Sequence, residues 1–71
     1  MGNRVLHNQI RILRELKGIA QAELAECVGT SRETIGKLER GVYQNPSFKL
    51  VYDIAAFFEK PIEDVFKFVE E

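Results

Sequence analysis

Three charged side chains within six positions of the sequence carry groups that can recognise the edges of nucleotide bases. Arg32 can present a two-donor guanidinium fork to guanine. Lys37, about one and a half turns further along a helix, can reach guanine or a phosphate. Glu33 can accept a hydrogen bond from a cytosine amino group, or it can instead hold Arg32 in place. A helix with a purely structural role can carry the same residues on its solvent-exposed face. The surrounding elements must therefore decide between a helix that recognises bases and a structural helix.

Residues 21–41, QAELAECVGTSRETIGKLERG, predict two short helices joined by a tight turn. Apolar residues at spacings of three and four form one face on each helix: Leu24, Ala25 and Val28 on the first, Ile35 and Leu38 on the second. Gly29 can adopt the positive φ that ends the first helix, and Thr30 and Ser31 can cap the second. Gly41 then closes the second helix. Such a pair predicts a helix-turn-helix, whose second helix can lie in a DNA major groove.

The same periodicity leaves more polar positions on the outer side of the second helix. The Thr34 hydroxyl and methyl can meet a phosphate or a thymine methyl, whereas Arg40, at the helix end, is better placed for the DNA backbone. Gly36 leaves a gap that would permit close approach to the groove. We therefore expect Thr34 and Arg40 to position the helix while other residues read the bases.

Length and composition exclude several classes of protein. The 71 residues allow one domain, residues 1–71, which would bury only about 60% of its unfolded surface and could need a partner subunit. The apolar runs are too short for a membrane span and no secretory signal is present, so we expect a cytoplasmic protein. A single cysteine, Cys27, and a single histidine exclude an internal disulfide and a metal cluster of familiar spacing. We expect no metal, cofactor or small-molecule ligand, and we expect Cys27 to be a small, partly buried hydrophobe.

The carboxylates do not predict an active site. Glu33 with Glu39, and Glu63 with Asp64, form sequence pairs, but no histidine, cysteine or serine constellation accompanies them. No glycine-rich phosphate loop occurs either. We therefore expect a protein that is not an enzyme.

Charge is distributed unevenly along the chain. The net charge of −1 argues against a general nucleic-acid coat protein. However, residues 1–50 hold eight Lys/Arg and five Asp/Glu, net +3, whereas residues 51–71 hold two and six, net −4. A basic front and an acidic back suit a domain that docks one face on DNA, although an acidic tail can also aid solubility.

The segment before residue 21 predicts a first helix. It runs from Arg4 or Asn8 to Lys17, with a short strand at residues 3–6 as an alternative. Apolar residues at helical spacing predict its buried stripe: Leu6, Ile10, Leu13 and Leu16.

The segment after residue 41 predicts a loop and two more helices. Pro46 keeps the preceding residue extended, and Ser47 caps a helix that ends near Phe58. Pro61 suits the first turn of a last helix, and the ending FKFVEE alternates as a strand would. The sequence thus predicts an all-α bundle of about five short helices, with a short terminal strand as the alternative.

Phenylalanines concentrate apolar surface near the C-terminal end. Four of the five follow Phe48, which is more than a short tail needs. We hypothesise that the segment 59–71 and its neighbour contribute to a homodimer through Phe57, Val65, Phe66 and Phe68.

The motif resembles the helix-turn-helix of the lambdoid phage repressor and Cro proteins and of the wider xenobiotic-response-element (XRE) type regulators. The matching residues are Gln21, Ala22, Glu23, Leu24, Ala25, Val28, Gly29, Thr30, Ser31, Thr34, Ile35, Leu38, Glu39 and Gly41. A weaker similarity extends from about Ile10 to Phe66. The resemblance implies a lambda-repressor-like helical bundle and a regulator that binds double-stranded DNA.

The resemblance also implies roles for residues outside the second helix. Candidate contacts to the DNA backbone are Gln21 at the start of the motif, Ser31 at the turn, and Tyr43, Gln44, Asn45 and Lys49 in and after the loop. Arg14 is implied to pair with Glu39, which would tie the first helix to the third. Ala20 departs from the family, where Ser, Thr or Asn is usual, so about 1 kcal/mol of cap stabilisation and one backbone contact are lost.

Two functions from different classes follow. The favoured one is a sequence-specific transcriptional regulator, a repressor or an activator, acting as a homodimer at a palindromic operator. The alternative is a protein-interaction module with the same fold, such as an antitoxin-like or coactivator-like adaptor, which the slightly acidic pI of 5.8 supports.

Overall fold

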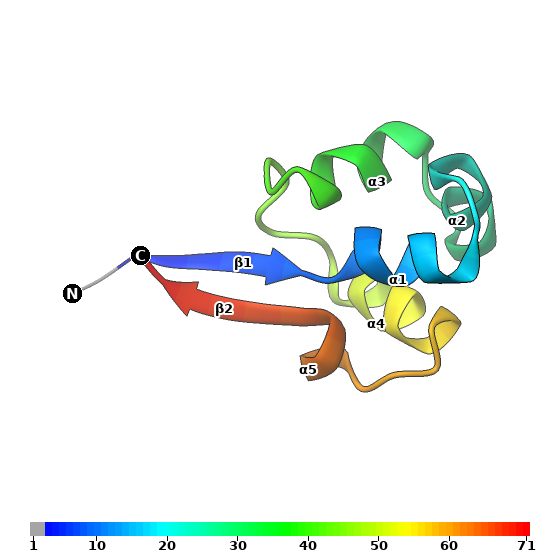
Figure 1. Cartoon of the computed structure of the whole chain (residues 1–71). Helices are drawn as coiled ribbons and strands as arrows, with labels where there is room; N and C mark the ends of the chain where they lie inside the picture. Colours follow the sequence, from blue (N-terminus) through cyan, green and yellow to red (C-terminus); the bar gives the residue numbers. More distant parts are fainter. Residues whose placement is uncertain (1–2) are drawn as a thin grey trace.

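The computed structural model describes residues 3–71. The elements follow one another in the order β1 (Arg4–Asn8), α1 (Ile10–Lys17), α2 (Gln21–Val28), α3 (Arg32–Glu39), α4 (Phe48–Phe57), α5 (Ile62–Val65) and β2 (Phe66–Glu70). The helices pack into one body, from which β1 and β2 project together as a ribbon (Figure 1). The fold is thus mainly helical, as predicted.

The two strands confirm the strand alternatives at both ends of the chain and add a small sheet to the predicted all-α bundle. β1 and β2 pair antiparallel, with Arg4 opposite Glu70, Leu6 opposite Phe68, and Asn8 opposite Phe66. The first helix therefore begins at Ile10 and not at Arg4, and Leu6 enters the core from a strand. The local pattern of this short segment fits a helix as well as a strand. The segment forms a strand because it pairs with β2, which lies some sixty positions further along the chain.

The core joins the motif helices to the remaining elements. Its largest fully buried side chains are Ile10, Leu24, Ile35, Leu38, Ile54 and Val65. α2 ends at Gly29, whose φ of 73° is strained for any residue with a side chain, and Gly41 closes the turn after α3 with a φ of 76°. The glycines at both ends of the motif therefore have the conformational role that the sequence predicts.

Two positions depart from the predicted burial. Leu16 is 79% exposed, because α1 contributes only Ile10 and part of Leu13 to the core and Leu16 lies beyond it in the last turn. Cys27 is exposed, since it lies roughly 100° around α2 from the buried Val28.

The C-terminal residues also correct part of the dimer hypothesis. Val65 and Phe66 are only 1% and 6% exposed, because both pack into the core of their own chain. They therefore have almost no surface left for a second copy. Phe57 is partly buried against the same core, whereas Phe68 remains 53% exposed.

Candidate nucleic-acid interface

The start of α3 is fixed by side-chain caps. The backbone N–H of Thr34 donates to Ser31 Oγ at 3.1 Å, and the two hydroxyls lie 2.8 Å apart. This cap satisfies one of the free N–H groups at the start of the helix. In the free protein the Ser31 hydroxyl therefore holds α3, whether or not it also meets a phosphate.

α3 presents the three candidate base-reading side chains to solvent. Arg32, Glu33 and Lys37 are all exposed. Lys37 Nζ lies 3.8 Å from Glu33 Oε2, while Arg32 Nη1 donates to Gln21 Oε1 at 3.1 Å. Glu33 therefore faces Lys37, and the suggestion that it holds Arg32 is wrong for the free protein.

A partly buried ion pair ties α1 to the end of α3. Arg14 Nε donates to Glu39 Oε2 at 2.8 Å and Arg14 Nη2 donates to Glu39 Oε1 at 3.2 Å, which is a bidentate pair. Arg14 Nη1 also donates to the carbonyl of Ile19 at 2.9 Å, in the α1–α2 turn. The pair implied by the family resemblance is thus present, and it fixes three segments against one another.

Gln21 extends this pair to the recognition side of the molecule. Its Nε2 donates to Glu39 Oε1 at 3.0 Å, and its Oε1 accepts from Arg32. Both ends of the Gln21 amide therefore have partners, so its orientation is defined. A continuous chain of hydrogen bonds runs from Arg14 through Glu39 and Gln21 to Arg32.

The two charges of the pair shift each other's ionisation. Burial raises the pKa of the Glu39 carboxyl, but the hydrogen bonds from Arg14 and Gln21 outweigh it and leave this pKa below its ordinary value. The hydrogen bond to Glu39 raises the pKa of Arg14. Both groups are therefore charged at neutral pH.

The start of α2 lacks half of its cap, as the sequence predicts. Ala20 has no side-chain acceptor for the helix N–H groups. The reciprocal half remains, because the Ala20 N–H donates to Glu23 Oε1 at 3.1 Å. The remaining N–H groups at this end are free to meet an anion.

Gly36 does not form the open gap that the sequence suggested. The residue is buried, and a Cβ placed on it would lie 3.2 Å from Arg40 Nη1 and 3.8 Å from Gln21 Oε1. Gly36 therefore makes room for these two side chains of the protein itself, and they cover the helix at this point.

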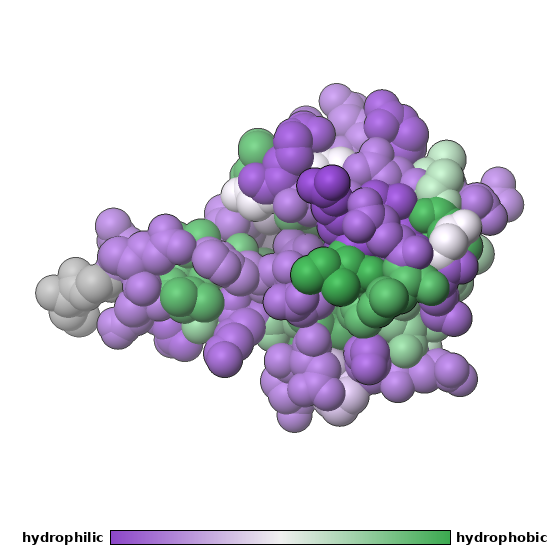
Figure 2. Space-filling model, in the orientation of Figure 1, coloured by the Kyte–Doolittle hydropathy of each residue, from purple (hydrophilic) through white to green (hydrophobic). Residues whose placement is uncertain are grey.

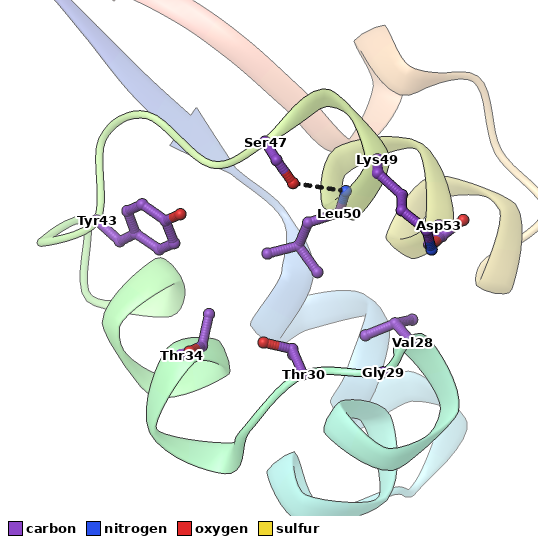
Figure 3. A pocket seen from close by; sticks show the side chains of 9 residues that line it. All are labelled: Val28, Gly29, Thr30, Thr34, Tyr43, Ser47, Lys49, Leu50 and Asp53. Atoms are coloured by element: carbon purple, nitrogen blue, oxygen red, sulfur yellow. Dashed lines mark hydrogen bonds and ion pairs between the residues drawn. The ribbon is translucent and has the colours of Figure 1, made fainter.

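A polar cleft of about 340 Å³ lies between α3, the following loop and the start of α4. Thr30, Thr34 and Tyr43 surround the open space from one side, and Ser47 and Lys49 approach from the other (Figure 3). Lys49 Nζ lies 2.6 Å from Asp53 Oδ2, and its side chain is 84% exposed. Three predicted backbone contacts, Thr34, Tyr43 and Lys49, are thus brought together.

A second polar cleft lies at the other side of α3. It is lined by Arg11, Arg14, Glu15, Gln21, Glu39 and Arg40. Thr34 and Arg40 project about 120° apart around the helix axis, so the two clefts lie on either side of Glu33 and Lys37. The exposed face of α3 therefore lies between two surfaces that carry cationic and hydroxyl or amide groups.

Two predicted loop contacts are placed elsewhere. The Gln44 amide accepts from the N–H of Leu6 at 2.8 Å and donates to the carbonyl of the same residue at 3.2 Å. Gln44 thus pairs with the edge of β1 as a strand would. Asn45 is exposed beside a mainly apolar groove and not in either polar cleft.

Arg11 also lines the second cleft, although the motif gave no indication of it. Its Nε donates to Glu15 at 3.2 Å while the side chain remains 71% exposed. No pattern around residue 11 distinguishes it from a solvated charge on α1. A cation one turn before Arg14 was the only signal in the sequence.

Residues 3–71 hold neither a metal-binding cluster nor a membrane-spanning helix. No group of three or more His, Cys, Asp and Glu side chains is arranged to hold a metal ion. No helix in this part of the chain is long and apolar enough to cross a membrane.

The arrangement of α2, the Gly29 turn and α3 is that of a helix-turn-helix protein. The family model described as "Helix-turn-helix" matches residues 10–65. The chain belongs to this helix-turn-helix family, which confirms the XRE-type resemblance of residues 21–41.

Individual relatives agree with this assignment. The chain is 48% identical over 66 residues to a protein of Archaeoglobus fulgidus described as an HTH-type transcriptional regulator, covering 93% of each. It is 38% identical over 66 residues to the HTH-type transcriptional regulator YgzD of Bacillus subtilis, covering 93% of this chain and 98% of YgzD. Among solved structures, the restriction-modification controller protein C.AhdI from Aeromonas hydrophila matches with a TM-score of 0.70 and 30% identity, over 79% of this chain and 80% of that protein.

Proposed function

We propose that the chain is a sequence-specific, double-stranded DNA-binding transcriptional regulator. The observation that carries the proposal is the exposed face of α3, where Arg32, Glu33 and Lys37 lie between two polar clefts. A helix of this kind can enter the major groove, and the clefts can then meet phosphates on the two sides of the groove. The relatives described as HTH-type transcriptional regulators support the regulatory role.

Base reading is assigned to α3. Arg32 donates its fork to guanine, Glu33 accepts from a cytosine amino group, and Lys37 donates to guanine or phosphate. The Gln21 amide supports Arg32 from outside the helix. Since Arg32 must leave this bond to reach a base, the bond holds the guanidinium in the free protein only, and the Gln21 amide is assigned to phosphate in the complex.

Backbone contacts are assigned to both clefts. Thr34, Tyr43 and Lys49 approach phosphates on one side of α3, and Gln21 and Arg40 approach them on the other, with Ser31 at the turn. Asn45 stays a weaker candidate because it lies outside the clefts. These contacts fix the depth and angle of α3 and carry little sequence information.

We infer a homodimer at a palindromic operator from the short length of α3. One short helix contacts only a few base pairs, so useful specificity requires two copies on half-sites about 34 Å apart. Such a regulator would act in the cytoplasm, as a repressor or as an activator of the genes beside its operator. The single domain, residues 1–71, would supply both the reading helix and the dimer contact.

The alternative, a protein-interaction module, is favoured by the exposed apolar residues Ile12 and Leu16 on α1. Fluorescence anisotropy with labelled duplexes at increasing salt separates the two functions. A DNA-binding protein that neutralises several phosphates must lose affinity steeply and log-linearly with salt. An interaction module would show no binding to duplexes at low salt.

A further inference from the structure

A mainly apolar groove of about 530 Å³ lies where the ribbon joins the helical body. Leu6 and Phe68 line it from the strands, and Phe48, Val51 and Ile62 line it from α4 and α5. Glu63 is the one charged side chain among the described residues around it. Large, charge-poor apolar surfaces of this kind are typical of interface cores.

Two phenylalanines at the groove are exposed. Phe48 is 73% exposed and Phe68 is 53% exposed, and both are large enough to fill part of such a hollow. Arg4 lies over the Phe68 ring, with its guanidinium carbon 5.1 Å from the ring centroid. The same patch therefore contains a hollow, two protruding aromatic side chains and charges of opposite sign.

The outer part of the ribbon lacks cover on this side, where Phe68 is exposed although Leu6 and Phe66 are buried. Each strand has only five residues, and the ribbon projects from the helices (Figure 1). A two-stranded ribbon is marginally stable by itself in water, and it gains stability when an apolar face packs against another layer. The face that carries Phe68 opposite Leu6 is the face that borders the groove.

We propose that a second copy of this chain covers the groove about a two-fold axis. A two-fold contact joins a patch to itself, so the patch must hold both the protruding groups and the hollow that receives them. Phe48 and Phe68 of one copy occupy the groove of the other, and Arg4 and Glu63 supply the complementary charges at its border. This inference rests on the proposed function, because it names the surface that joins the two DNA-reading domains.

Sedimentation equilibrium tests the contact with three single variants. The wild-type chain should sediment at twice its 8.2 kDa at micromolar concentration. Phe48→Glu and Phe68→Glu should each raise the dimer dissociation constant by at least about 30-fold, the effect of removing a central aromatic anchor. Leu16→Glu is the matched control, since Leu16 is also apolar and 79% exposed, but lies on α1. Circular dichroism checks that each variant keeps the helical content of the wild type.

The outcomes separate this contact from the proposed function. A monomeric wild type, or a dimer broken by Leu16→Glu and unaffected by both phenylalanine variants, would overturn the inference. Folded Phe48→Glu monomers that still bind a single half-site, but bind the full site without cooperativity, would support it. A dimer with the expected variant pattern but without any DNA binding would retain this surface and reject the proposed function.

Discussion

Arg32 and Gln21, the first residues of α3 and α2, are joined by a hydrogen bond of 3.1 Å between Arg32 Nη1 and Gln21 Oε1. The residue assigned to base recognition and the residue assigned to a phosphate contact are therefore hydrogen-bonded to each other. Glu39 holds the other end of the Gln21 amide, so the Arg14–Glu39 pair is connected through a single side chain to the face proposed to read DNA.

Replacing Arg32 should relax recognition at one base position. Arg32→Ala removes the guanidinium fork, and we expect a loss of about 1–3 kcal/mol on the preferred site with little change on unrelated duplexes. Competition binding with single-base variants of the site measures both values. Lys60→Ala, a charge removed from the segment between α4 and α5, is the control and should leave the base preference intact.

Replacing Gln21 should act on all sequences alike. Gln21→Ala removes a phosphate contact, so affinity should fall by a similar factor for preferred and unrelated duplexes. The same competition assay applies. If the base preference changed instead, the bond from Gln21 to Arg32 would be setting base recognition and the phosphate role would be wrong.

The lowered pKa of Glu39 predicts a loss of stability in acid. A carboxyl with a lower pKa in the folded state stabilises the fold fully above its unfolded value of about 4.5, and this contribution disappears as pH falls through the lowered folded value. Glu39→Gln should therefore flatten the decline of the unfolding free energy below this pH. It should also lower stability at pH 7 by about 1–3 kcal/mol, because a neutral amide replaces the charged partner of Arg14.

Urea unfolding at pH 3 to 7 measures this effect. Glu26→Gln is the control, since Glu26 is exposed on α2. An equal decline in wild type and Glu39→Gln would show that other carboxylates cause the acid sensitivity.

Glu59 has a backbone conformation that favours glycine. Its φ is 56°, at the turn that follows α4. Glu59→Gly should relieve the left-handed strain and raise the unfolding free energy by about 1 kcal/mol, or the melting temperature by roughly 5 °C. Lys60→Gly, one position later and not strained in this way, should lower both values. Thermal unfolding followed by circular dichroism compares the two variants, and a lower melting temperature for Glu59→Gly would contradict the expectation.

Lys49 should contribute charge without sequence preference. Its exposed ammonium at the first cleft is assigned to phosphate, so Lys49→Ala should reduce the slope of log affinity against log salt by about 1. Lys67→Ala on β2, outside both clefts, should leave the slope unchanged. Equal slopes for the wild type and Lys49→Ala would remove Lys49 from the interface.

Local sequence signals predicted the motif well. Gly29, Ser31 and Gly41 act through backbone conformation and capping, which depend on neighbours within a few residues, and the structure has each of them as expected. The Arg14–Glu39 pair was reached only through the family resemblance, because nothing in the local pattern joins residues 25 positions apart.

Local sequence signals could not predict the ribbon of β1 and β2 or the residues that pack against it. β1 is defined by its pairing with β2 at the far end of the chain, so a helix starting at Arg4 was an equally good interpretation of the local pattern. Val65 and Phe66 were expected at a dimer surface because hydrophobicity alone does not distinguish a core from an interface. Gln44 was expected to contact DNA, but its amide forms hydrogen bonds with Leu6 on β1. The local pattern could not predict this contact, because the two residues are 38 positions apart in the sequence.

Selection of bound duplexes from a random pool by the wild-type chain tests the central proposal most directly. We expect enrichment of a palindrome with two half-sites about one helical turn apart, roughly 34 Å between centres, and with a guanine in each half-site whose enrichment is lost in Arg32→Ala. A pool that remains random after repeated rounds, with a folded protein, would contradict sequence-specific DNA binding.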